Sequence, residues 1–313
     1  MGDGPAWFPQ SWWFPTTVRG FPTESGVGDD RRVTREPLDV DALRALLAPA
    51  GPLARLEVVE TSSSTNTELV DAVRSAATPW PAPAVLVAEA QTAGRGRAGR
   101  TWQTPRHAAL TASVLLRPRV PDAALGWLPL LAGVAVARTL RDAGADARLK
   151  WPNDVLVPAA TAAEGLGPFR KVAGILAEVV PGGGAPAVVV GIGVNVAQGA
   201  DELSVPTATS LALEGASTDR TALLAGLVRH LAAVVEQLEE AGGDATAAGL
   251  AAAYGAMSAT LGSDVRAELA AGGGVVDGRA VRLADDGALV VATPDGERTV
   301  RAGDVHHLRA ARR

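Results

Sequence analysis

One stretch restricts the fold more than any other: residues 187–196, AVVVGIGVNV, form an almost unbroken apolar run. A half-exposed strand alternates apolar and polar residues, whereas a continuous apolar run predicts a strand covered on both faces. Two segments with the helical spacing of apolar residues, 128–144 and 219–240, supply long helices to cover it. We therefore expect an α+β fold in which a mixed β-sheet is flanked by helices.

Shorter segments complete this pattern. A first helix is predicted within 38–49, capped by Asp39 or Asp41, and a second follows the hydroxyl-rich start of 62–76. Residues 158–170 are expected to form a loose loop between two strands. The predicted strands cover residues 54–60, 84–90, 108–118, 147–157 with a break at Pro152, and 171–180.

Composition narrows the class of protein. The chain has 313 residues, 47% of them apolar, and no cysteine, which excludes disulfides, thiol catalysis and cysteine-bound metals. No apolar run approaches the roughly 20 residues that span a bilayer. The N-terminus lacks a signal-peptide pattern, so we expect a cytoplasmic protein with no membrane partner. The net charge of -5 argues against non-specific binding to nucleic acid.

Three regions differ in texture. Residues 1–36 are rich in Gly, Pro, Asp and Arg without periodicity, which predicts a disordered extension. Residues 37–257 carry the predicted sheet and its helices. Residues 258–313 contain short alternating strands separated by Gly and Asp turns, which predicts a small closed β-barrel.

Gly94, Gly96 and Gly99 fit the pattern G-x-G-x-x-G after a predicted strand. A dinucleotide-binding turn would need a helix directly after the third glycine and an acidic residue about 20 positions further on. The chain instead reaches Pro105 after a polar stretch, and residues 117–121 contain no acid. We therefore reject a nicotinamide site.

The same loop carries Arg95, Arg97 and Arg100 between its glycines. Guanidinium groups form bidentate, charge-assisted bonds to phosphate and carboxylate oxygens. Three like charges on a glycine-rich segment predict a loop that is mobile when empty and folds over an anionic ligand. The alternative is a solvated basic surface loop.

Other segments add polar groups in unusual settings. KWPNDVLV at 150–157 places a lysine, an indole and an Asn-Asp pair at the junction of two strands. Lys171 precedes Gly174, for which we expect a tight turn. Asn195 lies among apolar residues, where an amide is costly unless its hydrogen bonds are made.

In this order the segments resemble the biotin protein ligases, or biotin–[acetyl-CoA-carboxylase] ligases. The resemblance is close over about residues 55–215 and looser over the tail. It implies a class II synthetase-like catalytic domain that binds biotin and ATP in 37–257, and an SH3-like barrel in 258–313. The matching blocks are STN at 64–66, AEAQTAGRGRAGRTW at 88–102, KWPNDVLV at 150–157, KVAGILAE at 171–178 and GIGVNV at 191–196.

The family joins biotin to ATP, giving biotinyl-5′-AMP and pyrophosphate, and then transfers biotin to one lysine of the biotin carboxyl carrier domain of an acyl-CoA carboxylase. Some members carry an N-terminal DNA-binding domain and repress transcription. Only about 20 residues of expected ordered structure precede the first block here, so we expect the form without that domain and no DNA partner. The resemblance also admits a homodimer.

The resemblance also implies residue roles. Biotin would be bound by Ser64, Thr65, Asn66, Gln91, Arg95, Gly96, Arg97, Lys171 and Gly174. ATP and the adenylate would be bound by Arg97, Arg100, Trp102, Asn153, Lys171 and Asn195, with Trp102 beside the adenine. The catalytic group would comprise Arg95, Arg97, Lys150, Asp154 and Lys171. Lys150 and Asp154 would lie where the acceptor lysine arrives. No residues have metal-ligand spacing, so Mg²⁺ would be held through the ATP phosphates.

Simpler explanations stay open for some of these residues. Ser64 or Thr65 can cap a helix, Trp102 and Trp151 can be core residues, and Asn153 with Asp154 can form an ordinary turn. His306 and His307 are expected to be edge-strand residues. Two other functions are a lipoate or octanoyl transferase on a related scaffold, and a non-catalytic biotin-responsive regulator.

Overall fold

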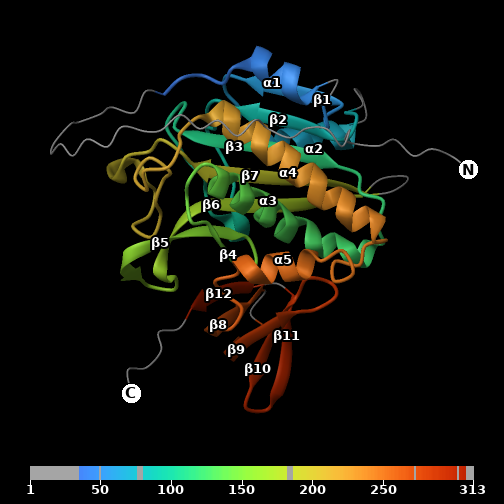
Figure 1. Ribbon diagram of the computed structural model, residues 1–313, viewed down its shortest axis with the longest axis vertical. Coiled ribbons are helices and arrows are strands. Elements are labelled where there is room, and N and C mark those ends of the chain that lie inside the picture. The colour runs from blue at the N-terminus through green and yellow to red at the C-terminus, as the bar shows by residue number, and fades with distance from the viewer. Residues whose placement is uncertain are drawn as a thin grey trace, which may run out of the picture.

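A computed structural model of the protein describes residues 35–48, 51–75, 80–181, 186–270, 273–301 and 303–307 (Figure 1). The predicted extension 1–36 lies outside these ranges except for its last two residues. Two sheets form the body of the molecule, with the larger sheet and its helices above and the smaller sheet below in the view of Figure 1.

The larger sheet has seven strands in the order β1-β2-β3-β7-β6-β5-β4. Strands β1 and β2 are parallel and every other neighbouring pair is antiparallel, so the predicted mixed sheet is confirmed. The strands are β1 Arg55–Val59, β2 Ala84–Ala88, β3 Ala109–Leu116, β4 Arg148–Lys150, β5 Asp154–Ala163, β6 Gly167–Val180 and β7 Ala187–Asn195.

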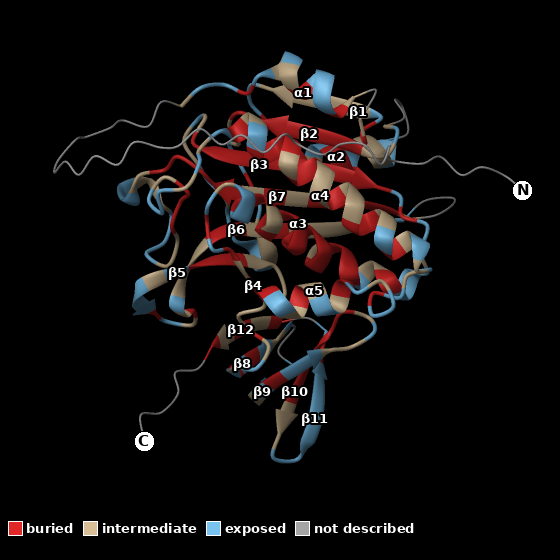
Figure 2. Cartoon of the chain, viewed as in Figure 1, coloured by how far each residue is buried: buried red, intermediate tan, exposed pale blue. Residues whose placement is uncertain are grey.

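Alternate side chains of this sheet enter two different cores, because successive residues of a strand point to opposite faces. Strand β2 is buried along its length (Figure 2). Its Val85 and Val87 join the main core, whereas Ala84 and Leu86 join a smaller one. The main core is closed by helices α1 Val40–Leu47, α3 Leu128–Asp142, α4 Arg220–Glu240 and α5 Leu250–Met257. Helix α2, Thr65–Ser75, packs on the opposite face through Leu69 and Val70. Residues 187–190 of β7 are thus covered on both faces, as the apolar run predicts.

The helix ends follow local chemistry. Asp39 caps α1, because its carboxylate accepts a hydrogen bond from the Ala42 amide at 2.9 Å. The segment Asp122–Asp142, which ends in α3, and helix α4 are each long and apolar enough to cross a membrane by length and composition alone. Their apolar windows are 72% and 50% buried in the protein, which is the behaviour of core helices. Helix α5 was not anticipated from the sequence.

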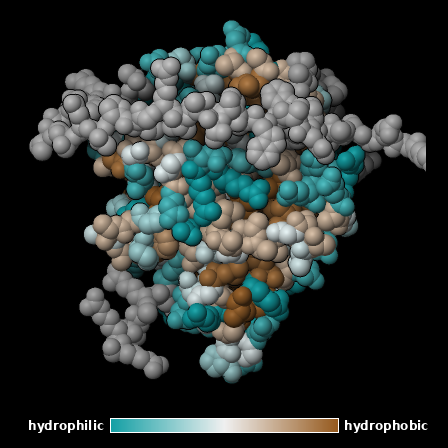
Figure 3. All heavy atoms as spheres, in the orientation of Figure 1, coloured by the Kyte–Doolittle hydropathy of each residue, from teal (hydrophilic) through white to brown (hydrophobic). Residues whose placement is uncertain are grey.

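The smaller sheet has five antiparallel strands in the order β11-β10-β9-β8-β12. This agrees with the expected β-rich C-terminal unit. Its exposed apolar residues include Val275 and Val281, and the face in Figure 3 shows hydrophobic atoms gathering toward this sheet. The strands are β8 Asp264–Leu269, β9 Val275–Leu283, β10 Leu289–Thr293, β11 Gly296–Val300 and β12 Gly303–His307.

Two indoles join the sheets. Trp127 Nε1 donates to the Asp285 carbonyl at 2.7 Å, and Trp151 Nε1 donates to the Gly287 carbonyl at 3.1 Å. Trp151 is only 2% exposed and belongs to the main core, so the alternative explanation as a core residue holds for this tryptophan. The main core runs without a break into the smaller sheet, where it includes Val265.

Two local expectations were wrong. Residues 158–170 do not form a loose loop: strands β5 and β6 continue into them and are joined by a tight turn at 164–166. Gly165 and Gly167 take φ values of 69° and 63°, which suit glycine and allow the chain to reverse. Gly174 does not form a tight turn either, because it lies within β6 and pairs with both neighbouring strands.

Candidate active site

A cavity of about 350 Å³ opens on the face of the large sheet that carries α2. This helix contacts β2, β3, β6 and β7, and the remaining part of the face forms a cavity floor. All fifteen residues singled out from the sequence line this cavity. They are Ser64, Thr65, Asn66, Gln91, Arg95, Gly96, Arg97, Arg100, Trp102, Lys150, Asn153, Asp154, Lys171, Gly174 and Asn195.

Two glycines of β7 keep the floor open. A Cβ on Gly193 would lie 2.5 Å from Trp102 Cε2, and one on Gly191 would lie 2.8 Å from Asn66 Oδ1. Both glycines therefore allow a side chain to lie flat on the sheet. Their role was missed in the sequence, although the signal was present: glycines two positions apart lie on the same face of a strand.

Hydroxyl and amide groups form one end of the cavity. The Gln91 side-chain oxygen accepts hydrogen bonds from the Thr65 amide at 2.8 Å and from Thr65 Oγ1 at 3.1 Å. Thr65 Oγ1 also lies 2.8 Å from Ser113 Oγ, on β3. Ser113 was missed, because alternation within an apolar strand does not reveal which residue faces a ligand. Ser64 Oγ accepts a hydrogen bond from the Thr67 amide at 3.4 Å, so a capping role coexists with its place in the cavity.

The glycine-arginine loop is closed on itself across the mouth of the cavity. The Trp102 amide donates to the Gly94 carbonyl at 2.8 Å, and the Gly96 amide donates to the Arg100 carbonyl at 2.7 Å. Between these bonds Ala98 adopts a left-handed conformation with a φ of 53°. Residues other than glycine rarely take this conformation, so the turn stores backbone strain at its tip.

Each loop arginine pairs with a different element. Arg95 donates to Thr67 Oγ1 on α2 at 3.1 Å and to Glu178 on β6 at 3.4 Å. Arg97 NH1 donates to Asn153 Oδ1 at 3.2 Å. Arg100 forms an ion pair with Asp304 on β12. All three side chains are thus paired, while those of Arg95 and Arg100 remain 49% and 57% exposed.

Glu178 and Asp304 are further residues of this network that were missed in the sequence. Glu178 accepts hydrogen bonds from both Asn66 and Arg95. Its signal was its alternation with Gly174 and Leu176, which line the cavity from the same strand. Asp304 carried no comparable signal, because only tertiary packing brings β12 to the loop.

Two lysines share one carboxylate at the centre of the cavity. Lys171 Nζ lies 2.5 Å from Asp154 Oδ1, and Lys150 Nζ lies 3.6 Å from Asp154 Oδ2. Burial by itself raises the pKa of Asp154, but the charges of Lys171 and Lys150 outweigh it and hold that pKa below its usual value. Burial lowers the pKa of Lys150, and Asp154 offsets this only in part. Asp154 is therefore ionised at neutral pH and lies close to the Nζ atoms of both lysines.

An indole and an amide form the other end of the cavity. The Lys171 ammonium lies 5.8 Å from the centroid of the Trp102 ring, within the range of a cation–π contact. Asn195 donates to the Thr209 carbonyl at 2.9 Å and accepts from Gln198 at 3.0 Å, so its buried amide is satisfied. Four buried side-chain polar atoms in the described residues lack a partner. They are Ser62 Oγ, Asn66 Oδ1, Trp102 Nε1 and Gln198 Oε1, of which the last three belong to residues that line the cavity.

No group of three His, Asp or Glu side chains in the described residues has the arrangement of a metal site. The one carboxylate at the centre of the cavity, Asp154, is occupied by Lys150 and Lys171. The chemistry of these donors fits anions better than a metal held by protein ligands alone.

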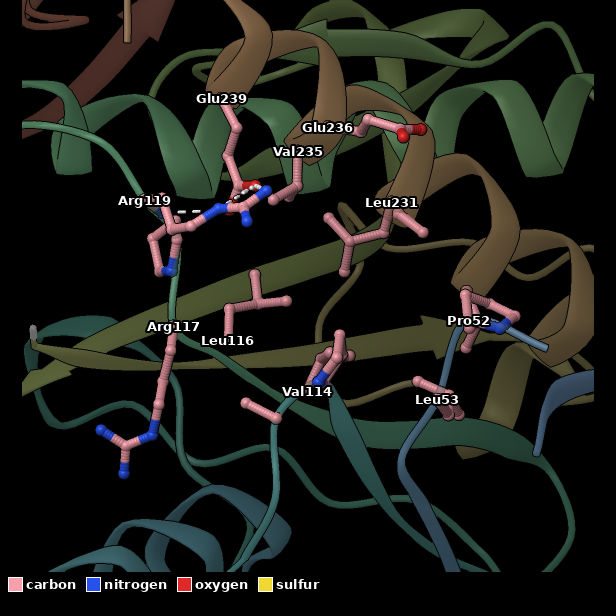
Figure 4. A pocket seen from close by; sticks show the side chains of 15 residues that line it. Pro52, Leu53, Val114, Leu116, Arg117, Arg119, Leu231, Val235, Glu236 and Glu239 are labelled. Atoms are coloured by element: carbon pink, nitrogen blue, oxygen red, sulfur yellow. Dashed lines mark hydrogen bonds and ion pairs between the residues drawn. The ribbon is translucent and has the colours of Figure 1, made fainter. Parts of the chain in front are cut away.

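A second cavity of about 200 Å³ lies on the opposite face of the sheet, between β3 and α4 (Figure 4). Its wall is mainly apolar and includes Val114, Leu116 and Leu231, and its rim carries the ion pair between Arg119 and Glu239 at 2.9 Å. None of the residues singled out from the sequence lines it.

The fold and the cation-rich cavity define the class of protein ligases that act with biotin or lipoate. The Biotin/lipoate A/B protein ligase family model matches residues 58–195, and the Biotin protein ligase C terminal domain model matches residues 260–308. The chain is 42% identical over 287 residues to a biotin–[acetyl-CoA-carboxylase] ligase of Mycobacterium tuberculosis, covering 90% of this chain and 99% of that protein. The chain belongs to the biotin protein ligase family.

Two other similarities extend this result. The bifunctional ligase/repressor BirA of Escherichia coli is 36% identical over 214 residues, covering 66% of this chain and 61% of that protein. The structure of the biotin protein ligase from Aquifex aeolicus in complex with biotin and ATP is 26% identical, with a TM-score of 0.64. That comparison covers 82% of this chain and 100% of the other.

Proposed function

We propose that this protein activates biotin with ATP to biotinyl-5′-AMP and then transfers biotin to one lysine of the biotin carboxyl carrier domain of an acyl-CoA carboxylase. Family membership gives the biotin ligase activity. The observation that carries the residue assignments is that five separated sequence blocks supply one cavity with a polar end, a cationic centre and an aromatic end. The protein is then a two-step ligase without a covalent enzyme intermediate.

Biotin would lie with its ureido ring at the polar end. Thr65, Gln91 and Ser113 already form a connected set of donors and acceptors there. A ligand without the ring would shield these groups from water and give them no partner beyond one another, which disfavours that ligand. This supports biotin over lipoate or octanoate as the substrate.

The cationic centre would serve the first step. A biotin carboxylate attacking the α-phosphate brings two anions together, and cations fixed in advance offset their repulsion and the charge that builds on the phosphorus oxygens. Lys171, held at 2.5 Å by Asp154, and the loop residues Arg95 and Arg97 would supply this charge. Most of the acceleration would come from position and charge.

The aromatic end would hold the nucleotide. The Trp102 ring lies flat over Gly193 and would flank the adenine, and Asn195 would bond its amino group. Arg100 and Asn153 would border the phosphates. Closing the glycine-arginine loop would keep hydrolytic water from the adenylate until the acceptor arrives.

Lys150 and Asp154 would meet the acceptor lysine in the second step. The acceptor lysine arrives as an ammonium ion and must give up a proton before its nitrogen can attack the adenylate, and Asp154, which is ionised and lines the cavity, would take that proton. The amide bond would then form as AMP leaves. Mg²⁺ would be carried on the ATP phosphates and would neutralise part of their charge.

The remaining parts of the proposal concern context. We propose residues 37–257 as the catalytic domain and 258–313 as a small C-terminal domain, since α5 ends at Met257 and β8 begins at Asp264. The net charge of -5 supports a ligase without a DNA partner. A cytoplasmic location and a homodimer are expectations that fractionation and sedimentation would test.

The decisive experiment incubates the protein with biotin, ATP, Mg²⁺ and a carrier domain, and weighs the carrier by mass spectrometry. We expect biotin on one lysine, release of pyrophosphate, and about 10²-fold slower adenylate formation by Lys171→Ala. Arg170→Ala, outside the cavity, is the control. Release of ADP, or labelling by lipoate instead of biotin, would contradict the proposal. An unaffected Lys171→Ala variant would contradict the role assigned to Lys171, and binding of biotin without any labelling of the carrier would point to a regulator.

A further inference from the structure

The edge of the large sheet next to the turn at 151–153, between β4 and β5, is completed by a segment that follows α5. Strand β4 is the last strand of the sheet, and residues 258–260 run along its free edge. The Ala259 amide donates to the Leu149 carbonyl at 2.8 Å. Beyond the end of β4 the hydrogen bonding between the two segments continues through a side chain: the Trp151 amide donates to Thr260 Oγ1 at 3.1 Å.

The Thr260 hydroxyl is also hydrogen-bonded to His307, on β12. Its Nε2 lies 3.0 Å from Thr260 Oγ1, and Thr260 is fully buried. Thr260 Oγ1 accepts the Trp151 amide proton, and its own proton is free to go to His307 Nε2 when that nitrogen is the unprotonated one of the ring. The chain of bonds runs from β12 through Thr260 to the backbone between Lys150 and Pro152.

The same histidine also fixes the wall of the cavity. The His307 amide donates to the Gly165 carbonyl at 3.0 Å, and its ring bonds the backbone of Leu166. Gly165 and Leu166 form the turn between β5 and β6 and line the cavity. His307 therefore joins the C-terminal sheet to two sides of the active site, and is not merely an edge-strand residue.

The surroundings keep this ring neutral. Burial, the charge of Lys150 and, least, that of His306 together lower the pKa of His307 to about 4, although the Leu166 bond and the charge of Asp154 act in the opposite direction. At neutral pH Nε2 is therefore available as the acceptor that the Thr260 hydroxyl requires. Because its Nε2 atom is already bonded to the Thr260 hydroxyl, His307 does not itself contact the reacting atoms.

We propose that His307 and Thr260 are positioning residues for the transfer step: together they fix the Trp151 backbone, and through it the side chain of Lys150 beside Asp154. This inference rests on the proposed function, since it concerns the second of the two reactions. A misplacement of about 1 Å costs on the order of 10²-fold in rate, so a loosened turn slows the transfer. Adenylate formation depends on Lys171 and the arginine loop and is affected less.

The test compares the two half-reactions in Thr260→Val and Thr260→Ser. Valine keeps the shape but leaves the Trp151 amide and His307 Nε2 without a partner, whereas serine keeps the hydroxyl. We expect Thr260→Val to transfer biotin from preformed adenylate at least about tenfold more slowly, with adenylate formation and the KM for biotin changed less than about threefold. Thr260→Ser should restore most of the transfer rate.

Thr139→Val is the matched control, because Thr139 is also buried and its hydroxyl donates only to the Ala135 carbonyl of its own helix, at 2.9 Å. His307→Phe removes the same bond from the other side and decides the question if Thr260→Val does not fold. Equal loss in both half-reactions, equal loss in the valine and serine variants, or failure of both Thr260→Val and His307→Phe to fold would overturn the proposal. Absence of adenylate from the wild-type protein would instead overturn the proposed function.

Discussion

Single residues of the glycine-arginine loop show how this site is prepared for its ligand. The loop places three guanidinium groups close together, and each is held by a neutral or acidic partner from another element. The bonds of Arg95 and Arg97 are between 3.1 and 3.4 Å long, at the weak end of hydrogen bonding. A phosphate or carboxylate would offer stronger, charge-assisted bonds, so ligand binding is expected to draw these side chains away from their present partners.

The variant Arg97→Ala tests, at one position, whether a loop arginine binds the ligand more strongly than its present partner. Removing a charge-assisted bond costs about 1.5 to 3 kcal/mol, so we expect the adenylate to dissociate about 10 to 100 times faster. Its single bond to Asn153 is 3.2 Å long, and the melting temperature should fall by no more than about 2 °C. Filter retention of labelled adenylate and a thermal scan measure the two effects, with Arg170→Ala as the control. Equal damage to both quantities would mean that the loop is a structural element.

At the scale of elements, the cavity depends on strands that pack one face into the main core and line the active site with the other. On β7, Val190 and Ile192 fill the main core while Gly191 and Gly193 leave space for side chains of the site. On β3, Val114 enters the core and Ser113 reaches Thr65. A strand can serve a core and an active site at once because its side chains alternate.

His307, on β12, is expected to make the folding stability of the protein depend on pH. The pKa of His307 is about 4 in the folded protein and near 6.5 when unfolded, so the unfolded state binds the extra proton between these values. The stability from this group is complete above pH 6.5 and is lost as the pH falls toward 4. We expect the wild type to lose about 2 to 3 kcal/mol more than His307→Phe between pH 7 and pH 4.5 in urea titrations. Parallel pH curves for the two proteins would show that His307 is already charged in the fold.

At the scale of the whole molecule, one buried ion pair joins distant parts of the chain. Arg220 at the start of α4 lies 2.6 Å from Glu89 at the end of β2, and both side chains are less than 5% exposed. Arg220 also donates to the Glu36 carbonyl at 2.6 Å, and Glu89 accepts the Leu38 amide at 2.6 Å. These bonds tie the first described residues to the sheet and to α4.

We expect Arg220→Met to lower the free energy of unfolding by about 3 to 5 kcal/mol, because it leaves the Glu89 carboxylate buried and unpaired. Arg119→Ala breaks an ion pair whose arginine is 68% exposed, and should cost about 1 kcal/mol or less. Denaturant titrations of both variants check the difference. Similar losses in the two proteins would show that water reaches Glu89 once Arg220 is gone.

Much of the fold could be predicted because its cause is local. The apolar run of β7, the helical spacing in α3 and α4 and the Asp39 cap each depend on residues near in sequence. The hairpin at 158–170 could not, since its Ala-rich strands have no strong pattern and are stabilised by pairing between β5 and β6. Helix α5 likewise has apolar residues on all sides and forms where the main core admits it.

The sequence by itself determined the chemistry: the cations, hydroxyls and amides of the site are present in blocks of a few residues, and their types and order indicate biotin and ATP. Only the tertiary structure decided which residues complete the site from afar. Ser113, Glu178, Asp304 and His307 reach it through strand pairing and packing between elements far apart in the chain. Contacts of that kind depend on the whole fold, and the local pattern of residues does not encode them.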